Sequence, residues 1–214
     1  MPTKFDKREY RKIDAAEMET RKEETGEMVV EGYATTFNMP YRLFGDDKVT
    51  VNEQVDRDAF KETDMSDVIM QYDHEGPVFA RISNGTLTIE ADEHGLKVTA
   101  NLGGTERGRQ LFEEIDGGYT NKMSFGFTVT GDKKERKRDE DGHVTILRTI
   151  TKIGKLYDVS AVSLPANDAT EISSRTISDG LIAEALEEVR AEEERQRRIG
   201  EIRKLLKGEQ TDDE

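Results

Sequence analysis

The sequence has no cysteine, no tryptophan and only four prolines among its 214 residues. Without cysteine, a disulfide framework, thiolate metal ligands and a cysteine nucleophile are all excluded. No apolar run approaches the roughly 18 residues of a membrane span, and the charged first residues do not include the apolar segment of a secretory signal. We therefore expect no membrane partner.

Positive charge is also scarce, since the formal net charge is −14 at pH 7. This balance argues against a general nucleic-acid binder, because phosphate contacts need a positive surface. The densest basic run, residues 133–138, is followed at once by Asp139-Glu-Asp141 and is typical of a solvated hairpin tip. The three histidines, His74, His94 and His143, are scattered along the chain and indicate no metal site. We expect neither a metal nor a cofactor.

Charge and hydrophobic period divide the chain into three parts. Residues 1–26 are charged and lack a steady period, which predicts an extended or disordered N-terminal arm. Residues 27–175 contain short alternating runs of β-forming residues and one helical stretch over 105–115, which predict a β-rich domain. Residues 178–214 carry apolar residues at helical spacing and an acidic excess, so we expect a helical tail that packs on the domain or binds a partner. Strands are predicted at 28–37, 48–55, 68–74, 78–82, 86–91, 96–102, 121–130, 144–153 and 155–164.

The run 121–130 has a large apolar residue at every second position. Read as a strand, it directs four of them to a single face: Met123, Phe125, Phe127 and Val129. Ser124 and Gly126 lie on the other face, where the missing side chain of the glycine would let another backbone approach closely. This is a suitable setting for a nucleophilic serine, although serines on the solvent face of strands are also a common structural feature.

A serine hydroxyl attacks a carbonyl only when a base takes its proton, and histidine does this best when an acidic group or a second imidazole orients it. Besides Ser124, the sequence offers His74 at the end of a predicted strand and Asp158 on a late predicted strand. Their order along the chain differs from the orders of chymotrypsin-like, subtilisin-like and α/β-hydrolase enzymes. A G-x-S-x-G motif is also absent, because Lys122 stands where its first glycine would be.

Five short blocks, in order along the chain, resemble the prohead (capsid maturation) proteases of tailed bacteriophages. They are Gly32-Tyr-Ala34 with Phe37, Tyr72-Asp-His74, Thr105-Glu-Arg-Gly-Arg109 with Leu111, Met123-Ser-Phe-Gly-Phe127, and Leu156-Tyr-Asp-Val-Ser160 with Pro165-Ala-Asn167. Those enzymes are similar to the herpesvirus maturation protease, assemblin. The resemblance implies an α+β fold in which helices wrap a β-barrel core, followed here by a C-terminal helical extension.

The resemblance also implies roles for the site residues, with His74 as the general base and Ser124 as the nucleophile. Phage relatives usually carry a carboxylate in the late strand, which falls here on Asp158, whereas herpesvirus enzymes use a second histidine, for which His143 is the candidate. Glu75 is a further alternative because it adjoins the base. We prefer Asp158, since His143 adjoins a flexible Asp-Gly turn and neighbouring strand residues point to opposite faces.

The function implied by the resemblance is that of a serine endopeptidase acting through an acyl-enzyme. Its substrates would be the major capsid protein with its scaffolding segment, and the protease itself, inside the procapsid in the host cell cytoplasm. In that setting the helical tail 178–214 would bind scaffold or capsid protein and be removed by self-cleavage. The herpesvirus relatives are dimers, so fold analogy suggests a homodimer. The alternative is a non-catalytic capsid assembly or scaffolding factor with the same fold, whose helical tail serves as internal scaffold.

Overall fold

The computed structural model describes residues 8–13, 18–163 and 172–206, which form eleven strands, two α-helices and one short 3-10 turn. The strands are β1 (Arg8–Ile13), β2 (Glu19–Lys22), β3 (Met28–Thr36), β4 (Tyr41–Gly45), β5 (Val49–Val55), β6 (Ile69–Tyr72), β7 (Glu75–Arg81), β8 (Leu87–Ala91), β9 (Gly95–Asn101), β10 (Lys122–Arg138) and β11 (Val144–Val162). The helices are α1 (Glu106–Asp116) and α2 (Ile172–Leu206), and the 3-10 turn is Ile82–Asn84.

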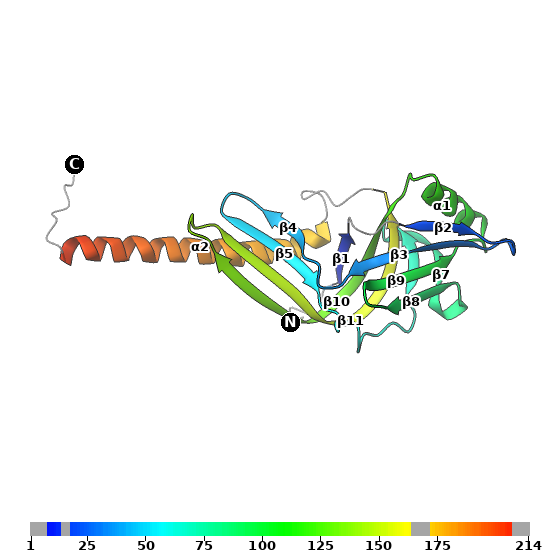
Figure 1. Ribbon diagram of the computed structural model, residues 1–214, viewed down its shortest axis with the longest axis horizontal. Helices are drawn as coiled ribbons and strands as arrows, with labels where there is room; N and C mark the ends of the chain where they lie inside the picture. Colours follow the sequence, from blue (N-terminus) through cyan, green and yellow to red (C-terminus); the bar gives the residue numbers. More distant parts are fainter. Residues whose placement is uncertain (1–7, 14–17, 164–171, 207–214) are drawn as a thin grey trace.

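Two sheets make up the body of the molecule (Figure 1). The larger has the strand order β1-β10-β11-β5-β4, with β6 pairing with β11 and β7 pairing with β6. The smaller has the order β2-β3-β9-β8. Within the larger sheet β11 pairs in parallel with both β5 and β6, at opposite ends of its length. The strand β11 therefore links two separate regions of one sheet.

The main core lies between the two sheets and beside α1. The apolar face of β10 behaves as its sequence predicts, since its four alternating residues are all buried: Met123, Phe125, Phe127 and Val129. Val30 and Val98 from the smaller sheet and Phe112 from α1 belong to the same cluster. Each large side chain buried in this way contributes about 1.5–3 kcal/mol, so this cluster fixes the position of β10.

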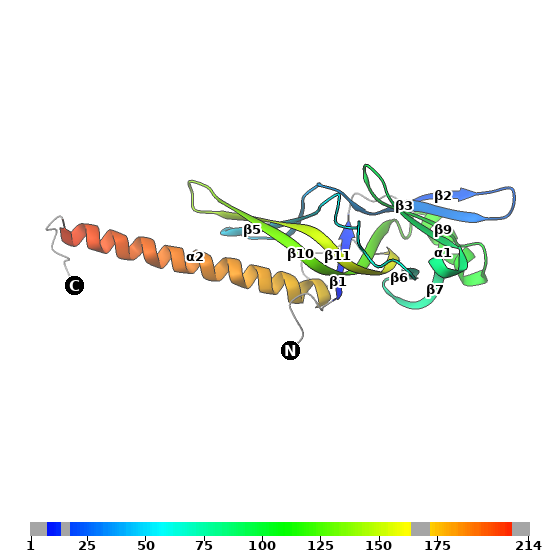
Figure 2. The same ribbon diagram turned by 90° about the horizontal axis from the view of Figure 1, so that it is seen from below.

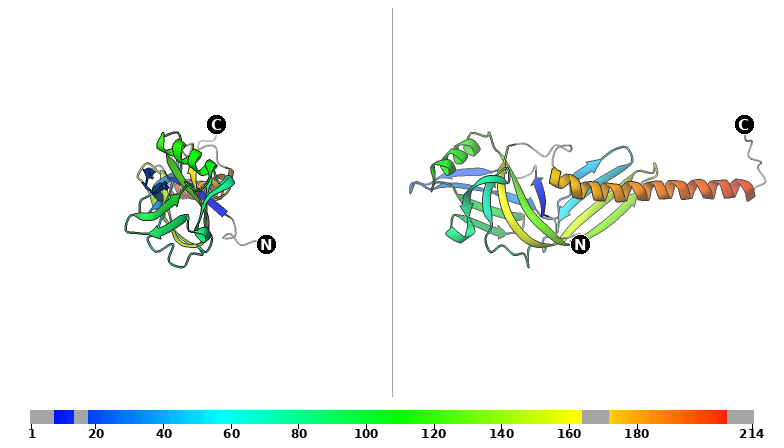
Figure 3. Two further views of the ribbon diagram at one scale, coloured as in Figure 1. Left: turned by 90° about the vertical axis from the view of Figure 1, so that its right-hand side faces the viewer. Right: turned by 180° about the vertical axis from the view of Figure 1, so that it is seen from behind.

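The helix α1, which matches the helical stretch predicted over 105–115, begins at a capping residue. The hydroxyl of Thr105 accepts a hydrogen bond from the backbone N–H of Gly108 at 3.0 Å, which satisfies a donor at the first turn. Leu111, Phe112 and Ile115 form its buried face, and they pack α1 against the end of the core near β2, β3 and β7. An end-on view shows the helix beside the sheets (Figure 3).

The long helix α2 packs by its first half against the larger sheet and then continues beyond it (Figures 1 and 2). Val189 and Leu186 belong to a small apolar cluster with Val144 and Ile146 from the distal part of β11 and Val49 from the neighbouring strand β5. Most described side chains past residue 190 are exposed. Neither helix in the described part of the chain has both the length and the apolar character needed to cross a bilayer.

The fold is α+β, as the sequence predicts, and strands make up most of its regular structure. The barrel wrapped by helices is not confirmed, because the described residues form two sheets without closing a barrel. The charged stretch 1–26, expected to be extended or disordered, contributes the strands β1 and β2. The basic run 133–138, expected at a hairpin tip, continues β10 instead, and the turn falls after Arg138.

Candidate active site

Two neighbouring strands of the larger sheet, and the turn that follows a third, supply the site residues that the sequence predicts. Ser124 lies on β10, Asp158 lies on the adjacent β11, and His74 follows β6, which pairs with β11 on its other side. In the β10–β11 ladder Asp158 is opposite Gly126, and Ser160 is opposite Ser124. The sheet therefore brings together residues that lie far apart in the sequence.

His74 is the second residue of a two-residue hairpin loop between β6 and β7. Tyr72 pairs with Glu75 across this loop, and both Asp73 (φ 48°) and His74 (φ 63°) have left-handed backbone. Positive φ at both central residues is the signature of a type I′ turn, whose twist suits a tight hairpin. The sequence pattern predicted a regular strand through His74, but the strand ends at Tyr72 and the turn sets the direction of the imidazole.

The three side chains form a chain of hydrogen bonds. The Nε2 atom of His74 lies 2.5 Å from the hydroxyl oxygen of Ser124. On the other side of the ring, Nδ1 makes a short hydrogen bond to Oδ2 of Asp158. A carboxylate accepts hydrogen bonds, so the contact with Asp158 favours the tautomer with its proton on Nδ1, in which Nε2 faces the serine hydroxyl as an acceptor. This is the tautomer that a general base needs.

A second serine, Ser160, connects the turn to the carboxylate. Its hydroxyl accepts a hydrogen bond from the backbone N–H of His74 at 3.2 Å and donates one to Oδ2 of Asp158 at 3.1 Å. Ser160 is fully buried, so both bonds are shielded from water. It therefore fixes the distance between the backbone that carries the imidazole and the carboxylate that orients it. Nothing in the sequence pattern indicated this positioning role of Ser160.

Gly126 is required here by side chains and not, as the sequence suggested, by a neighbouring backbone. A Cβ atom at this position would come within 2.4 Å of Oδ1 of Asp158 and within 2.7 Å of the ring of Tyr10. Oδ1 itself is buried without a hydrogen bond among the described residues, and the nearest cation is the guanidinium of Arg8 at 4.0 Å. The missing side chain of Gly126 thus makes room for the carboxylate.

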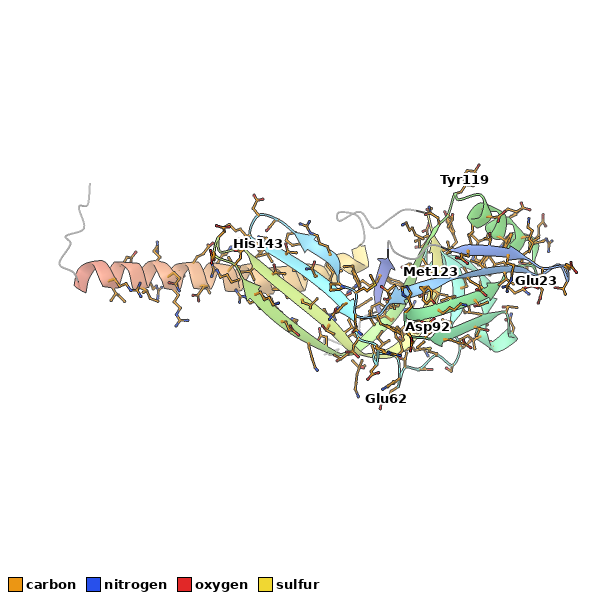
Figure 4. The ribbon with its side chains drawn as sticks, viewed as in Figure 1. Glu23, Glu62, Asp92, Tyr119, Met123 and His143 are labelled. Carbon is orange, nitrogen blue, oxygen red and sulfur yellow. The ribbon has the colours of Figure 1, made fainter. Side chains whose placement is uncertain are left out.

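The other candidates for the third position lie elsewhere. The ring of His143 contacts the hydroxyl of Thr50 at 3.0 Å and the backbone oxygen of Asp47 at 3.1 Å. Figure 4 shows His143 in the distal part of the hairpin, away from Met123, the neighbour of the candidate nucleophile. Glu75 is exposed in the first position of β7. Neither is therefore placed to orient the imidazole of His74.

The site is covered by the N-terminal strand β1, in a stretch where the sequence pattern predicted no strand. This strand pairs with β10 in antiparallel register, with Lys12 opposite Ser124 and Tyr10 opposite Gly126. The ring of Tyr10 lies over His74 with 4.4 Å between the ring centroids. As a result the exposed fraction of the side chain is only 12% for His74 and 2% for Asp158, and Ser124 is fully buried.

A buried ionic network holds β1 from its opposite face. Arg11 binds both carboxylate oxygens of Glu53, with distances of 2.5 Å and 3.0 Å, and its guanidinium also contacts Glu9 at 2.5 Å. Arg148 contacts the same two glutamates at 2.7 and 2.8 Å, and the hydroxyl of Tyr41 donates to Glu53 at 2.6 Å. Charged pairs of this kind carry no hydrophobic period, which explains why the sequence pattern gave no signal for β1.

Burial and charge act in opposite directions on this network. Burial alone would raise the pKa of Glu53, but attraction to Arg11 and the hydrogen bonds from Arg11 outweigh it and lower the pKa to about 2. Burial would likewise lower the pKa of Arg11, yet attraction to Glu53 and Glu9 raises it above its ordinary value. Glu53 and Arg11 are therefore both ionised at neutral pH.

An open hollow of about 650 Å³ lies beside the site, between the β6–β7 hairpin and α1. Its walls include Asp73 and Glu75 on either side of the candidate base, and Arg107 and Glu114 from α1. None of His74, Ser124 and Asp158 lines it. Among the described residues, no group of three or more His, Cys, Asp or Glu side chains is arranged to hold a metal ion.

Comparison with known proteins bears on the same residues. No curated protein and no solved structure matches the chain. Residues 16–182, well over half of the sequence, match the family described as Caudovirus prohead serine protease. This range includes His74, Ser124 and Asp158. The chain therefore belongs to the caudovirus prohead serine protease family.

Proposed function

We propose that the protein is a prohead maturation endopeptidase that cuts the scaffolding segment of the major capsid protein, and itself, inside the procapsid in the host cell cytoplasm. One observation carries the proposal. In a member of a serine peptidase family, a serine hydroxyl, an imidazole and a carboxylate form an unbroken hydrogen-bonded chain. A scaffolding factor would have no use for this arrangement.

In the proposed mechanism the hydroxyl oxygen of Ser124 attacks the carbonyl carbon of the scissile peptide bond while Nε2 of His74 takes its proton. Asp158 stabilises the imidazolium that forms, and His74 then gives the proton to the leaving amine. Water hydrolyses the resulting ester by the same route in reverse. Every step uses groups of this chain and one water molecule, so the mechanism calls for no metal or cofactor.

The test is a comparison of the unchanged chain with its Ser124→Ala variant, alone and together with the capsid protein. Intact masses are followed over time. We expect the capsid protein and the protease to shorten only in the presence of Ser124. A matched control is Ser66→Ala, which removes an exposed hydroxyl bonded to Asp64 and should not change the products.

If both the capsid protein and the chain stay intact with the unchanged protein, the peptidase proposal fails. The non-catalytic assembly factor would then take its place, and binding of the capsid protein without cleavage would support it. A homodimer, proposed by analogy with herpesvirus relatives, is tested separately by the molecular mass in solution.

A further inference from the structure

The carbonyl group closest to the candidate nucleophile belongs to this chain. The backbone oxygen of Arg11 lies 2.9 Å from the hydroxyl oxygen of Ser124. The same hydroxyl is within 2.5 Å of Nε2 of His74. Because the carbon of a carbonyl group lies only about 1.2 Å from its oxygen, the peptide bond between Arg11 and Lys12 is next to the group that would attack it.

The residues before Arg11 lie along the site as an extended substrate would. β1 joins the edge of the larger sheet as an antiparallel strand, a common way for proteins to bind extended peptides. Tyr10 covers the ring of His74. The guanidinium of Arg8 lies 3.8 Å from the centroid of the Tyr157 ring. The pairing with β10 and the contacts of Tyr10 and Arg8 thus hold residues 8–11, the side of the scissile bond that would form the acyl-enzyme.

The side chain of Arg11 occupies a pocket that suits arginine. Arg11 is 3% exposed and Glu53, at the end of the pocket, is fully buried. The two parallel hydrogen bonds to Glu53 need a planar guanidinium, which lysine lacks.

Without β1, the pocket would keep an excess of negative charge. Arg11 and Glu9 would leave together, and the remaining ionised groups would be Glu53, Arg148 and Asp132, whose carboxylate contacts Arg148 at 2.7 Å. Two carboxylates would then face one guanidinium. Because an uncompensated buried charge is costly, a peptide that brings an arginine is favoured over one with a neutral side chain.

We propose that β1 is a built-in substrate, that Ser124 cuts the Arg11–Lys12 bond of its own chain, and that Glu53 selects arginine at the residue before the scissile bond. This inference rests on the proposed peptidase function and adds its substrate class. The same selection applies to the capsid substrate, which would pair with β10 after residues 8–11 have left.

The chemical step balances with one water molecule. The oxygen of Ser124 bonds to the carbonyl carbon of Arg11, and the C–N bond to Lys12 breaks as His74 passes the serine proton to the new amine. Water then attacks the ester and gives one proton to His74, which returns it to the serine oxygen. The remaining proton of the water passes from the new acid to the amine, so the products are a carboxylate at Arg11, an ammonium group at Lys12 and the regenerated hydroxyl of Ser124.

The test follows the intact mass of the full chain after purification. We expect the loss of residues 1–11, a new N-terminus at Lys12, and a first-order rate that does not depend on protein concentration. Arg11→Gln should slow this cut at least about tenfold, since the charged hydrogen bonds that it loses contribute roughly 1.5–3 kcal/mol. Arg11→Lys should fall between the two. Arg21→Gln, on the exposed strand β2, is the matched control and should leave the rate unchanged.

Other outcomes distinguish the proposed peptidase function from the proposed cut at the Arg11–Lys12 bond. Cuts that need Ser124 but fall elsewhere, with the Arg11–Lys12 bond intact, would overturn this inference and leave the peptidase function standing. A cut after Arg11 that persists in Ser124→Ala would point to a contaminating protease and would also overturn it. A rate that is the same for Arg11→Gln and the unchanged chain would remove the role of Glu53.

Discussion

The two halves of the β10–β11 hairpin use the same pair of strands in opposite surroundings. In the half nearer the site, residues 122–129 have an apolar core on one face and buried polar groups on the other. In the distal half, residues 133–138 are exposed and charged, and only a small apolar cluster under α2 supports the opposing strand. Register shifts between Gly126 and Asp132 separate the halves, and such bulges bend a strand. A polar site inside a sheet thus needs a covering strand, whereas the distal half needs none.

The largest expected effect is a loss of kcat when the negative charge of Asp158, in the half nearer the site, is removed. Asp158→Asn keeps the shape but favours the wrong imidazole tautomer, and comparable changes in serine peptidases lower kcat by about 10⁴. Glu135→Gln, on the exposed distal part of β10, is the control and should leave kcat unchanged. Cleavage of an arginine-containing peptide measures both. Equal rates for Asp158→Asn and the unchanged chain would contradict the assignment of Asp158.

Stability should also differ between the halves. Phe125→Ala empties a fully buried position stacked on Phe127, and we expect a loss of about 3–5 kcal/mol in the free energy of unfolding. Ile146→Ala, in the smaller distal cluster and 8% exposed, should cost about 2 kcal/mol. Urea unfolding of both variants makes the comparison. A larger loss for Ile146→Ala would show that the distal cluster is the main source of stability.

Alanine substitutions at two glycines of β10, Gly126 and Gly131, test how closely catalysis depends on the geometry of the site. An alanine at Gly126 would push on Asp158 and Tyr10, and a displacement near 1 Å lowers kcat by about 10². At Gly131 the added Cβ would lie 3.2 Å from Cβ of Lys152 and from Oγ1 of Thr151, a contact that a shift of a few tenths of an ångström relieves. Peptide cleavage should therefore be slow in Gly126→Ala and close to normal in Gly131→Ala. Similar rates for both would rule out a spatial requirement at Gly126.

The smallest expected effect is an acid-dependent loss of stability where β1 meets β5. The pKa of Glu53 is lowered to about 2 in the folded chain, below its unfolded value. Its contribution is therefore complete above the unfolded pKa and is lost as the pH falls toward the folded pKa. We expect a loss on the order of 1–2 kcal/mol between about pH 7 and pH 3.

Variants of Glu53 and of the exposed Glu135 test this pH dependence. In the Ser124→Ala background, which keeps β1 attached, urea unfolding of Glu53→Gln should show a flatter dependence on pH than the parent does, and Glu135→Gln should keep the slope of the parent. If Glu53→Gln does not fold, Arg11→Gln tests the same pair from its other side, since it removes the attraction that lowers the pKa of Glu53. An unchanged slope in Arg11→Gln would contradict the prediction.

The sequence predicted the parts of the fold that rest on hydrophobic alternation or on helix end signals. The buried face of β10 and the Thr105 cap of α1 are examples. It did not predict β1, because Glu9 and Arg11 are buried as charge partners and leave no apolar period. It also placed His74 in a strand, because the left-handed backbone of an Asp-His turn has no signal as strong as that of Asn-Gly.

The distance in sequence between β1 and its partner strand sets a time at which the site is assembled. Arg11 and Ser124 are 113 residues apart, and His74 and Asp158 are 84 residues apart. At roughly 5–20 residues per second, translation separates the first pair by on the order of ten seconds. A nascent chain that ends before Asp158 holds an incomplete set of site residues. The growing polypeptide therefore acquires its hydrolytic centre only when most of the domain has been synthesised.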